Sequence, residues 1–143
     1  VRFLIAGDGA ERDNLEALVK ELGAEEYVKF LGFVRDIYGF LNFIDVNTLT
    51  SLCESFPYSM LEGAAMRTPM VSSRVGGIPS LVIEGETGCF FKRDDVTSLS
   101  ESISGWFHAQ NARREQVRTA CYREIDENWT PEFELSVLKQ VLK

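Results

Sequence analysis

The sequence has few of the residues on which covalent cross-links and metal centres depend. Its 143 residues include three cysteines and one histidine. Cys53, Cys89 and Cys121 are widely separated and odd in number, and none belongs to a C-x-x-C pair, so their spacing fits neither a disulfide framework nor a zinc site. We expect reduced, mostly buried thiols and no metal. The only histidine, His108, is expected to be a structural residue on the surface or at the end of a helix.

The sequence also lacks an excess of basic residues and any long apolar run. Against 15 Lys and Arg residues there are 22 Asp and Glu residues, and the formal net charge is −7. This balance disfavours nucleic-acid partners, because non-specific binding to them depends on neutralising phosphates with Lys and Arg. No run reaches the roughly 18 apolar residues of a membrane-spanning helix, and no secretory leader is recognisable. We therefore expect a cytoplasmic protein without a transmembrane segment.

Short apolar runs alternate with helical patterns along the chain. The runs typical of strands cover residues 1–6, 28–31, 46–52, 70–73 and 89–91. Helical patterns cover residues 15–22, 37–44, 57–67, 81–83, 96–107, 117–121 and 133–141. Because parallel strands need long crossovers, this alternation predicts an α/β fold, namely a Rossmann-like, doubly wound parallel sheet with helices on both faces. No linker or repeat interrupts it, so residues 1–143 are predicted to form a single domain.

In such folds ligands bind beyond the carboxyl ends of the strands, so the turns after the strands hold the candidate residues. Four turns qualify, namely residues 7–9, 32–36, 53–59 and 73–79. We expect them to converge. Gly7 and Gly9 form only part of a dinucleotide-binding fingerprint, because Arg12 occupies the third glycine position, and a tight turn before the helix is the better explanation. The second strand ends without an acidic residue, which disfavours a NAD-dependent oxidoreductase.

The third of these turns is the most informative. Pro57 suits the first turn of a helix, where its missing N–H costs nothing. The amides around Phe56, Tyr58 and Ser59 would then lie at a helix N-terminus, which favours an anion such as a diphosphate.

Two carboxylates flank this helix start. Glu62, about one and a half turns into the helix, would reach a pair of hydroxyls such as a ribose diol, since a carboxylate accepts two hydrogen bonds at once. Glu54 would meet whatever lies beyond the phosphates. In the alternative interpretation Glu54 caps the helix, Glu62 is a solvated helix residue, and the turn binds nothing.

Several segments, taken in order, resemble the signature of glycosyltransferase family 4. They are residues 54–65 (ESFPYSMLEGAA), 69–79 (PMVSSRVGGIP) and 85–88 (GETG), preceded by 5–9 (IAGDG) and 30–34 (FLGFV) and followed by Trp129. Members are retaining enzymes of the GT-B architecture, in which two Rossmann-like domains face each other across a cleft. The resemblance implies the C-terminal, donor-binding domain of an enzyme that transfers a sugar from a nucleotide-diphospho-sugar to a glycan, lipid or other acceptor, commonly in polysaccharide biosynthesis.

The resemblance also implies roles for individual residues. Glu54 becomes the catalytic residue, which orients the hydroxyls of the donor sugar and stabilises an oxocarbenium-like transition state. Glu62 holds the ribose hydroxyls, and the backbone at Phe33 and Val34 holds the base. The donor-binding set is Glu62, Ser55, Phe56, Tyr58, Ser59, Phe33, Val34 and Gly7. The family generally needs no metal or other cofactor.

The sequence departs from the family pattern in three places. Ser80 replaces a common acidic residue, and Arg67-Thr68 replaces a small residue and a glycine. The family's first strand and helix, with a basic pair that clamps the diphosphate, would precede Val1 together with the acceptor-binding domain. We therefore expect the chain alone to bind nucleotide weakly, to transfer no sugar, and to form a homodimer through uncovered apolar surface. The parent enzyme is compatible with peripheral membrane association. A non-catalytic Rossmann-like nucleotide-binding or partner-binding module is the alternative function.

Overall fold

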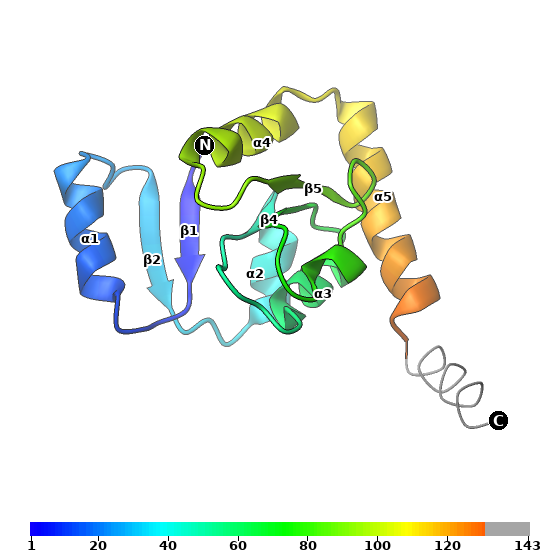
Figure 1. Cartoon of the computed structure of the whole chain (residues 1–143), viewed down its shortest axis with the longest axis horizontal. Helices are drawn as coiled ribbons and strands as arrows, with labels where there is room; N and C mark the ends of the chain where they lie inside the picture. The colour runs from blue at the N-terminus through cyan, green and yellow to red at the C-terminus, as the bar shows by residue number, and fades with distance from the viewer. Residues whose placement is uncertain (131–143) are drawn as a thin grey trace. The chain divides into compact units, whose positions relative to one another are not determined.

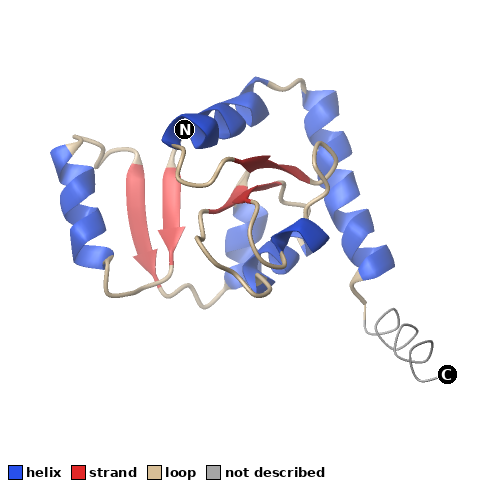
Figure 2. Cartoon of the chain, viewed as in Figure 1, coloured by secondary structure: helices blue, strands red, loops and turns tan. Residues whose placement is uncertain are grey.

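A computed structural model of the chain describes residues 1–130 and is shown in Figures 1 and 2. It divides into two compact units, Val1–Phe40 and Leu41–Lys143. The helix predicted at 133–141 lies outside the described residues. The division falls within α2 (Ile37–Phe43), and the prediction of a single domain over the whole chain stays a prediction.

The first unit contains one strand–helix–strand motif. β1 (Phe3–Ala6) is followed by α1 (Arg12–Glu21) and β2 (Val28–Gly32). The two strands are parallel, with Phe3 opposite Val28. The helix ends where expected, because Gly23 has a φ of 60°, which glycine adopts without steric cost. None of residues 1–40 is buried. The exposed apolar side chains of this unit include Val1, Phe3, Ile5, Leu15, Leu18 and Leu22.

The second unit is built on a three-stranded parallel sheet in the order β3-β4-β5. The elements in chain order are β3 (Asn47–Leu49), α3 (Tyr58–Ala65), β4 (Met70–Ser73), the 3₁₀ helix η1 (Ile78–Ser80) and β5 (Gly88–Phe91). All four residues of the central strand β4 are buried. Its register places Met70 opposite both Asn47 and Gly88. Both faces of this strand are therefore covered, although its second half consists of the two buried serines Ser72 and Ser73.

Two long helices complete this unit. α4 (Val96–His108) begins at Asp95, whose carboxylate accepts a hydrogen bond of 2.9 Å from the Ser98 amide. α5 (Asn111–Asn128) packs beside α3, as Figure 1 shows. The core between these elements consists of buried residues from helices, strand and loop, namely Met60, Ala64, Met70, Ile78, Leu81, Val82, Val117 and Cys121.

The predicted α/β class with parallel strands is confirmed, and most elements lie where the apolar pattern placed them. The short helix expected at 81–83 is instead the 3₁₀ turn Ile78–Ser80. Its proline suits the start of a helix, and the amides of Leu81 and Val82 both donate to the Ile78 carbonyl. No helix among residues 1–130 is long and apolar enough to span a membrane.

The structure confirms the predicted placement of His108 and of two of the three cysteines. Cys121 is buried and Cys89 is half-buried, and all three thiols are free. His108 is exposed at the end of α4 and its Nδ1 lies 2.8 Å from the Ser104 carbonyl oxygen. The prediction of mostly buried thiols is wrong for Cys53, which is exposed. Cys53 lies in the loop after β3, where residues 52, 53 and 55 all face solvent.

Candidate functional site

Two of the four candidate turns meet in the second unit. The amide of Gly77 donates to the carbonyl of Ser55 over 3.1 Å, and the Ser73 hydroxyl donates to the carbonyl of Ser51 over 2.6 Å. Gly76 has a φ of 52°, and a Cβ built on it would overlap the carbonyl oxygen of Glu54. Only glycine fits such a close approach of backbone. The loop before α3 and the loop after β4 therefore converge, as their positions after neighbouring parallel strands predict.

The start of α3 presents free backbone donors. Pro57 is the N-cap residue, with φ −86° and ψ 93°, and no side chain caps the helix. The amides of Met60 and Leu61 donate to the Pro57 carbonyl. Within the described part of the chain, the amides of Tyr58 and Ser59 have no acceptor. Orphan amides at the positive end of the helix dipole are a ready site for an anion.

The carboxylates flank this helix start as the sequence predicts. Glu54 is half-buried in the loop, and one of its oxygens lies 3.4 Å from the Ser51 hydroxyl. The interpretation that Glu54 caps α3 is therefore wrong, because its carboxylate bonds to a loop residue and leaves the helix amides free. Glu62 is half-buried on α3, and within residues 1–130 its carboxylate has no hydrogen-bond or ion-pair partner. Each carboxylate keeps acceptor capacity for a ligand.

The first turn of α3 is tied to the neighbouring strand. The side-chain amide of Asn47, on β3, donates to the carbonyl of Ser59 over 2.8 Å. Ser55, Tyr58 and Ser59 remain exposed, and Tyr58 is 71% accessible. The predicted residues of this segment therefore surround one solvent-accessible helix end.

An aromatic group lies beside this helix end. The Phe56 ring makes an edge contact with Tyr58, with centroids 5.8 Å apart and planes at 78°. It also packs on Trp129, with centroids 5.0 Å apart and planes at 38°. Sequence reasoning found Trp129 through the family resemblance alone and missed this contact, because no local pattern links a loop to the end of a helix so distant in sequence.

The first unit carries the other predicted residues, and there too a pair of turns meets. The amide of Gly7, whose φ is 125°, donates to the Gly32 carbonyl over 2.7 Å. Phe33 is 83% exposed and Val34 is half-buried. Gly7, Phe33 and Val34 thus lie in one pair of loops, separate in sequence and in unit from the segment that carries Glu54 and Glu62.

Arg12, which occupies the third glycine position of the fingerprint, is engaged by two carboxylates. Its guanidinium lies 2.8 Å from Glu16 and 3.5 Å from Asp8. The hydrogen bond to Glu16, above all, raises the pKa of Arg12. A Cβ built on Gly7 or Gly9 would meet no atom within 4 Å, so the backbone of this turn is open, and the role of Gly7 in donor binding stays a prediction.

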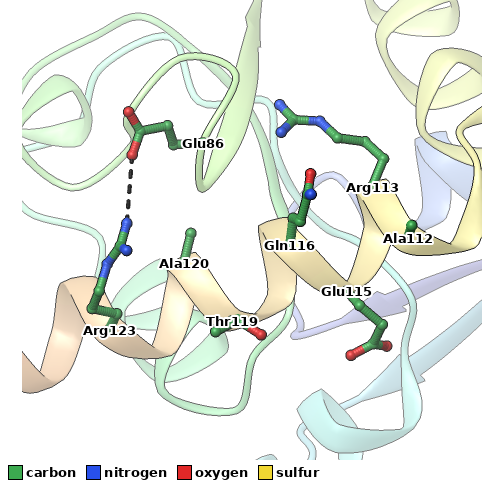
Figure 3. Close-up of a pocket in the computed structure, with 8 residues that line it drawn as sticks. All are labelled: Glu86, Ala112, Arg113, Glu115, Gln116, Thr119, Ala120 and Arg123. Carbon is green, nitrogen blue, oxygen red and sulfur yellow. Dashed lines mark ion pairs between the residues drawn. The ribbon is translucent and has the colours of Figure 1, made fainter.

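A surface groove of about 520 Å³ lies elsewhere in the second unit, along α5 (Figure 3). Its two arginines are already engaged, since Arg113 donates to the Gly85 carbonyl and Arg123 lies 3.7 Å from Glu86. None of the predicted site residues lines it. The groove therefore offers no free cation for a phosphate and is distinct from the α3 helix end.

The described residues also bear on metal binding. Among residues 1–130 no three His, Cys, Asp or Glu side chains are grouped so that they could hold a metal ion. The expectation that transfer needs no metal stays a prediction.

Comparisons with known proteins give the chain a family context. A family model described as "Glycosyl transferases group 1" matches residues 1–122. N-acetyl-alpha-D-glucosaminyl L-malate synthase of Bacillus anthracis is 32% identical over 127 residues, which cover 87% of this chain and 33% of that protein. An alpha-1,4-N-acetyl-D-galactosaminyltransferase of Campylobacter jejuni, whose named acceptor is a diNAcBac-PP-undecaprenol glycan, is 31% identical over 140 residues, which cover 97% of this chain and 37% of the relative.

A crystal structure of Anabaena Alr3699/HepE in complex with UDP has the same fold. It aligns with a TM-score of 0.86 at 22% identity, over 99% of this chain and 40% of the Anabaena chain. Another crystal structure of the Anabaena protein holds UDP-glucose. The present chain thus spans about a third of the length of the two curated relatives.

Proposed function

The chain belongs to the glycosyl transferases group 1 family, and from this premise we propose that it is the donor-binding domain of a retaining glycosyltransferase. The parent enzyme transfers a sugar from a nucleotide-diphospho-sugar to a glycan, lipid or other acceptor. The observation that carries the proposal is the start of α3, where two amides that have no acceptor among residues 1–130 lie in sequence between two half-buried carboxylates.

The proposal gives each part of this helix end one task. The amides of Tyr58 and Ser59 bind the diphosphate, because the helix dipole and the free N–H groups both favour negative charge there. Glu62 accepts hydrogen bonds from the ribose hydroxyls. Glu54, on the loop that precedes the helix, orients the donor sugar and stabilises the positive charge that develops at its anomeric carbon.

The remaining predicted residues complete the donor site in this proposal. Ser55 and Phe56 shape the loop beside the sugar, and the backbone at Phe33 and Val34, with Gly7 nearby in the same unit, holds the base. The acceptor is bound mainly by another part of the parent enzyme, because this chain covers about a third of its relatives. No metal or cofactor takes part. We place the parent in the cytoplasm, where free thiols such as Cys53 stay reduced.

Saturation-transfer NMR against UDP-, GDP- and ADP-sugars and NAD tests the proposal. UDP-sugars come first in the panel, because UDP and UDP-glucose occupy the Anabaena structures. The comparison variants are Glu62→Ala and, as a matched control, Glu101→Ala, which removes an exposed carboxylate from α4. We expect one nucleotide class to bind weakly, with its signal lost in Glu62→Ala and kept in Glu101→Ala. Binding of NAD alone contradicts the proposal.

A further inference from the structure

The ring of Phe56 joins three parts of the second unit at one point. It contacts Tyr58 on α3 and Trp129 at the end of α5, at centroid distances of 5.8 and 5.0 Å. A Cβ built on Gly77 would lie 3.3 Å from Phe56 Cδ2, so the ring also lies against the loop after β4. The side chain of Phe56 therefore meets α3, the end of α5 and the loop after β4.

The loop that carries Phe56 has little regular structure to hold it. Residues 50–57 lie between β3 and α3 and belong to neither helix nor strand. Among the described residues, the backbone of this loop is tied to the rest of the site at three points: Ser51 accepts from the Ser73 hydroxyl, Ser55 accepts from the Gly77 amide, and Pro57 accepts from the amides of Met60 and Leu61. The backbone of Phe56 makes no hydrogen bond to the described residues, so its place between Ser55 and Pro57 depends on how its ring packs.

Trp129, in contrast, is held firmly. It is half-buried against the core cluster of the second unit. Its backbone amide donates to the Ile125 carbonyl over 3.0 Å, and its indole N–H donates to the Glu124 carboxylate over 3.4 Å. A ring fixed in this way by its own helix gives Phe56 a rigid surface to pack against.

We infer that Trp129 is a positioning residue of the donor site, which sets the place of the Glu54–Pro57 loop through its contact with Phe56. The inference rests on the proposed function, since it assigns Trp129 to the same site. Trp129 itself touches no ligand in this scheme. It acts through Phe56 on the loop carbonyls and on the adjoining start of α3.

Trp106 provides a matched control. It is the only other tryptophan in the sequence, and it too is half-buried against the same core cluster, but it lies on α4 and has no ring contact with Phe56 among the described residues. Trp129→Ala and Trp106→Ala therefore remove similar apolar surface from one core, and only the first removes the support of the loop. Trp129→Phe and Trp106→Phe serve where an alanine variant does not fold.

Two measurements on the whole chain test the inference. In ¹H–¹⁵N spectra without ligand, Trp129→Ala should shift the amides of Ser55, Tyr58 and Gly77, and Trp106→Ala should leave them in place. In UDP titrations, Trp129→Ala should weaken affinity about two- to twelvefold, the range expected for one lost aromatic pair. Trp129→Phe, which keeps a ring, should stay within about twofold of wild type.

The outcomes separate this inference from the proposed function. Loop amides that respond equally to the two alanine variants overturn the inference, whether or not UDP binds. Shifted loop amides with unchanged UDP affinity overturn it as well, because the loop would then not belong to the donor site. A wild-type chain that binds no member of the nucleotide-sugar panel overturns the proposed function and the inference with it.

Discussion

Replacing Gly76 with alanine should damage both the stability of the second unit and its nucleotide binding. Gly76 has a φ of 52°, where an L-residue is strained by about 1–2 kcal/mol. The methyl group would also overlap the Glu54 carbonyl oxygen and lie 2.6 Å from the carbonyl carbon. Carbon atoms pack at about 3.5–4.0 Å, so the carbonyl carbon alone requires the loop that carries Glu54 to move by roughly 1 Å, and the carbonyl oxygen, which lies nearer, requires more.

A second glycine, Gly85, separates the effect of backbone strain from the effect of steric overlap. Gly85 has a φ of 77°, but the nearest atom to its added Cβ would be 4.0 Å away, on Arg113. Gly85→Ala therefore introduces conformational strain without steric overlap. Because alanine also restricts the unfolded chain, about 0.4–1 kcal/mol of that strain is offset. The substitution should lower the free energy of unfolding by about 1 kcal/mol. Gly76→Ala adds overpacking worth about 1–3 kcal/mol, for a total of about 2–4 kcal/mol.

Urea unfolding of wild type and both variants measures these costs, and a UDP titration of the same samples measures the effect on the site. Gly76→Ala should also weaken UDP binding, because Ser55 and Phe56 move with Glu54, and Gly85→Ala should not. Equal destabilisation by the two substitutions would refute the reasoning, since it would mean that the loop yields without cost. Full UDP affinity in a folded Gly76→Ala chain would refute the placement of the site.

Two further predictions concern the thiols and the exposed apolar side chains. Burial raises the pKa of Cys121 from 9.0 to about 12, so above pH 9 the unfolded chain releases this proton first and the folded state loses stability. Between pH 8 and pH 10 the free energy of unfolding of wild type relative to Cys121→Ala should fall by about 1.4 kcal/mol, and a constant difference would contradict the buried, protonated thiol. Sedimentation should show a dimer at high concentration, because Val1, Leu18 and Leu22 expose apolar surface. In a separate activity assay, the chain alone should transfer no sugar. A monomer at every concentration, or detectable turnover, would contradict these expectations.

The regular elements could be predicted because each has a period that the sequence displays. Leu15, Leu18, Val19 and Leu22 carry one face of α1, and Gly23 ends that helix in the left-handed conformation that glycine tolerates. The strand β4 lies at the predicted residues 70–73, where the apolar pair Met70 and Val71 begins a segment that is buried throughout. The convergence of the loops after β3 and β4 followed from topology, because parallel neighbours end at the same edge of a sheet.

The side-chain arrangement in the loops could not be predicted in this way. The contact of Phe56 with Trp129 joins segments with no common period, and only tertiary packing decides it. The exposure of Cys53 has the same cause, since a loop residue has no assigned face. The 3₁₀ turn at Ile78–Ser80 contains Pro79 and lies between the buried side chains of Ile78 and Leu81. Hydrophobic periodicity alone does not predict so short a turn.

The pair Gly76-Gly77 shows how a motif can serve a site without touching its ligand. A glycine pair after a strand permits either the close approach of a ligand or a backbone with positive φ. In the structure Gly76 has that positive φ, and both glycines are in close contact with the backbone of Glu54 and Ser55. The atoms that require glycine here are therefore protein atoms. On the proposed function, the Gly-Gly pair affects the donor indirectly. It allows the loop that carries Glu54 to pack closely against the loop after β4, and it does not contact the donor itself.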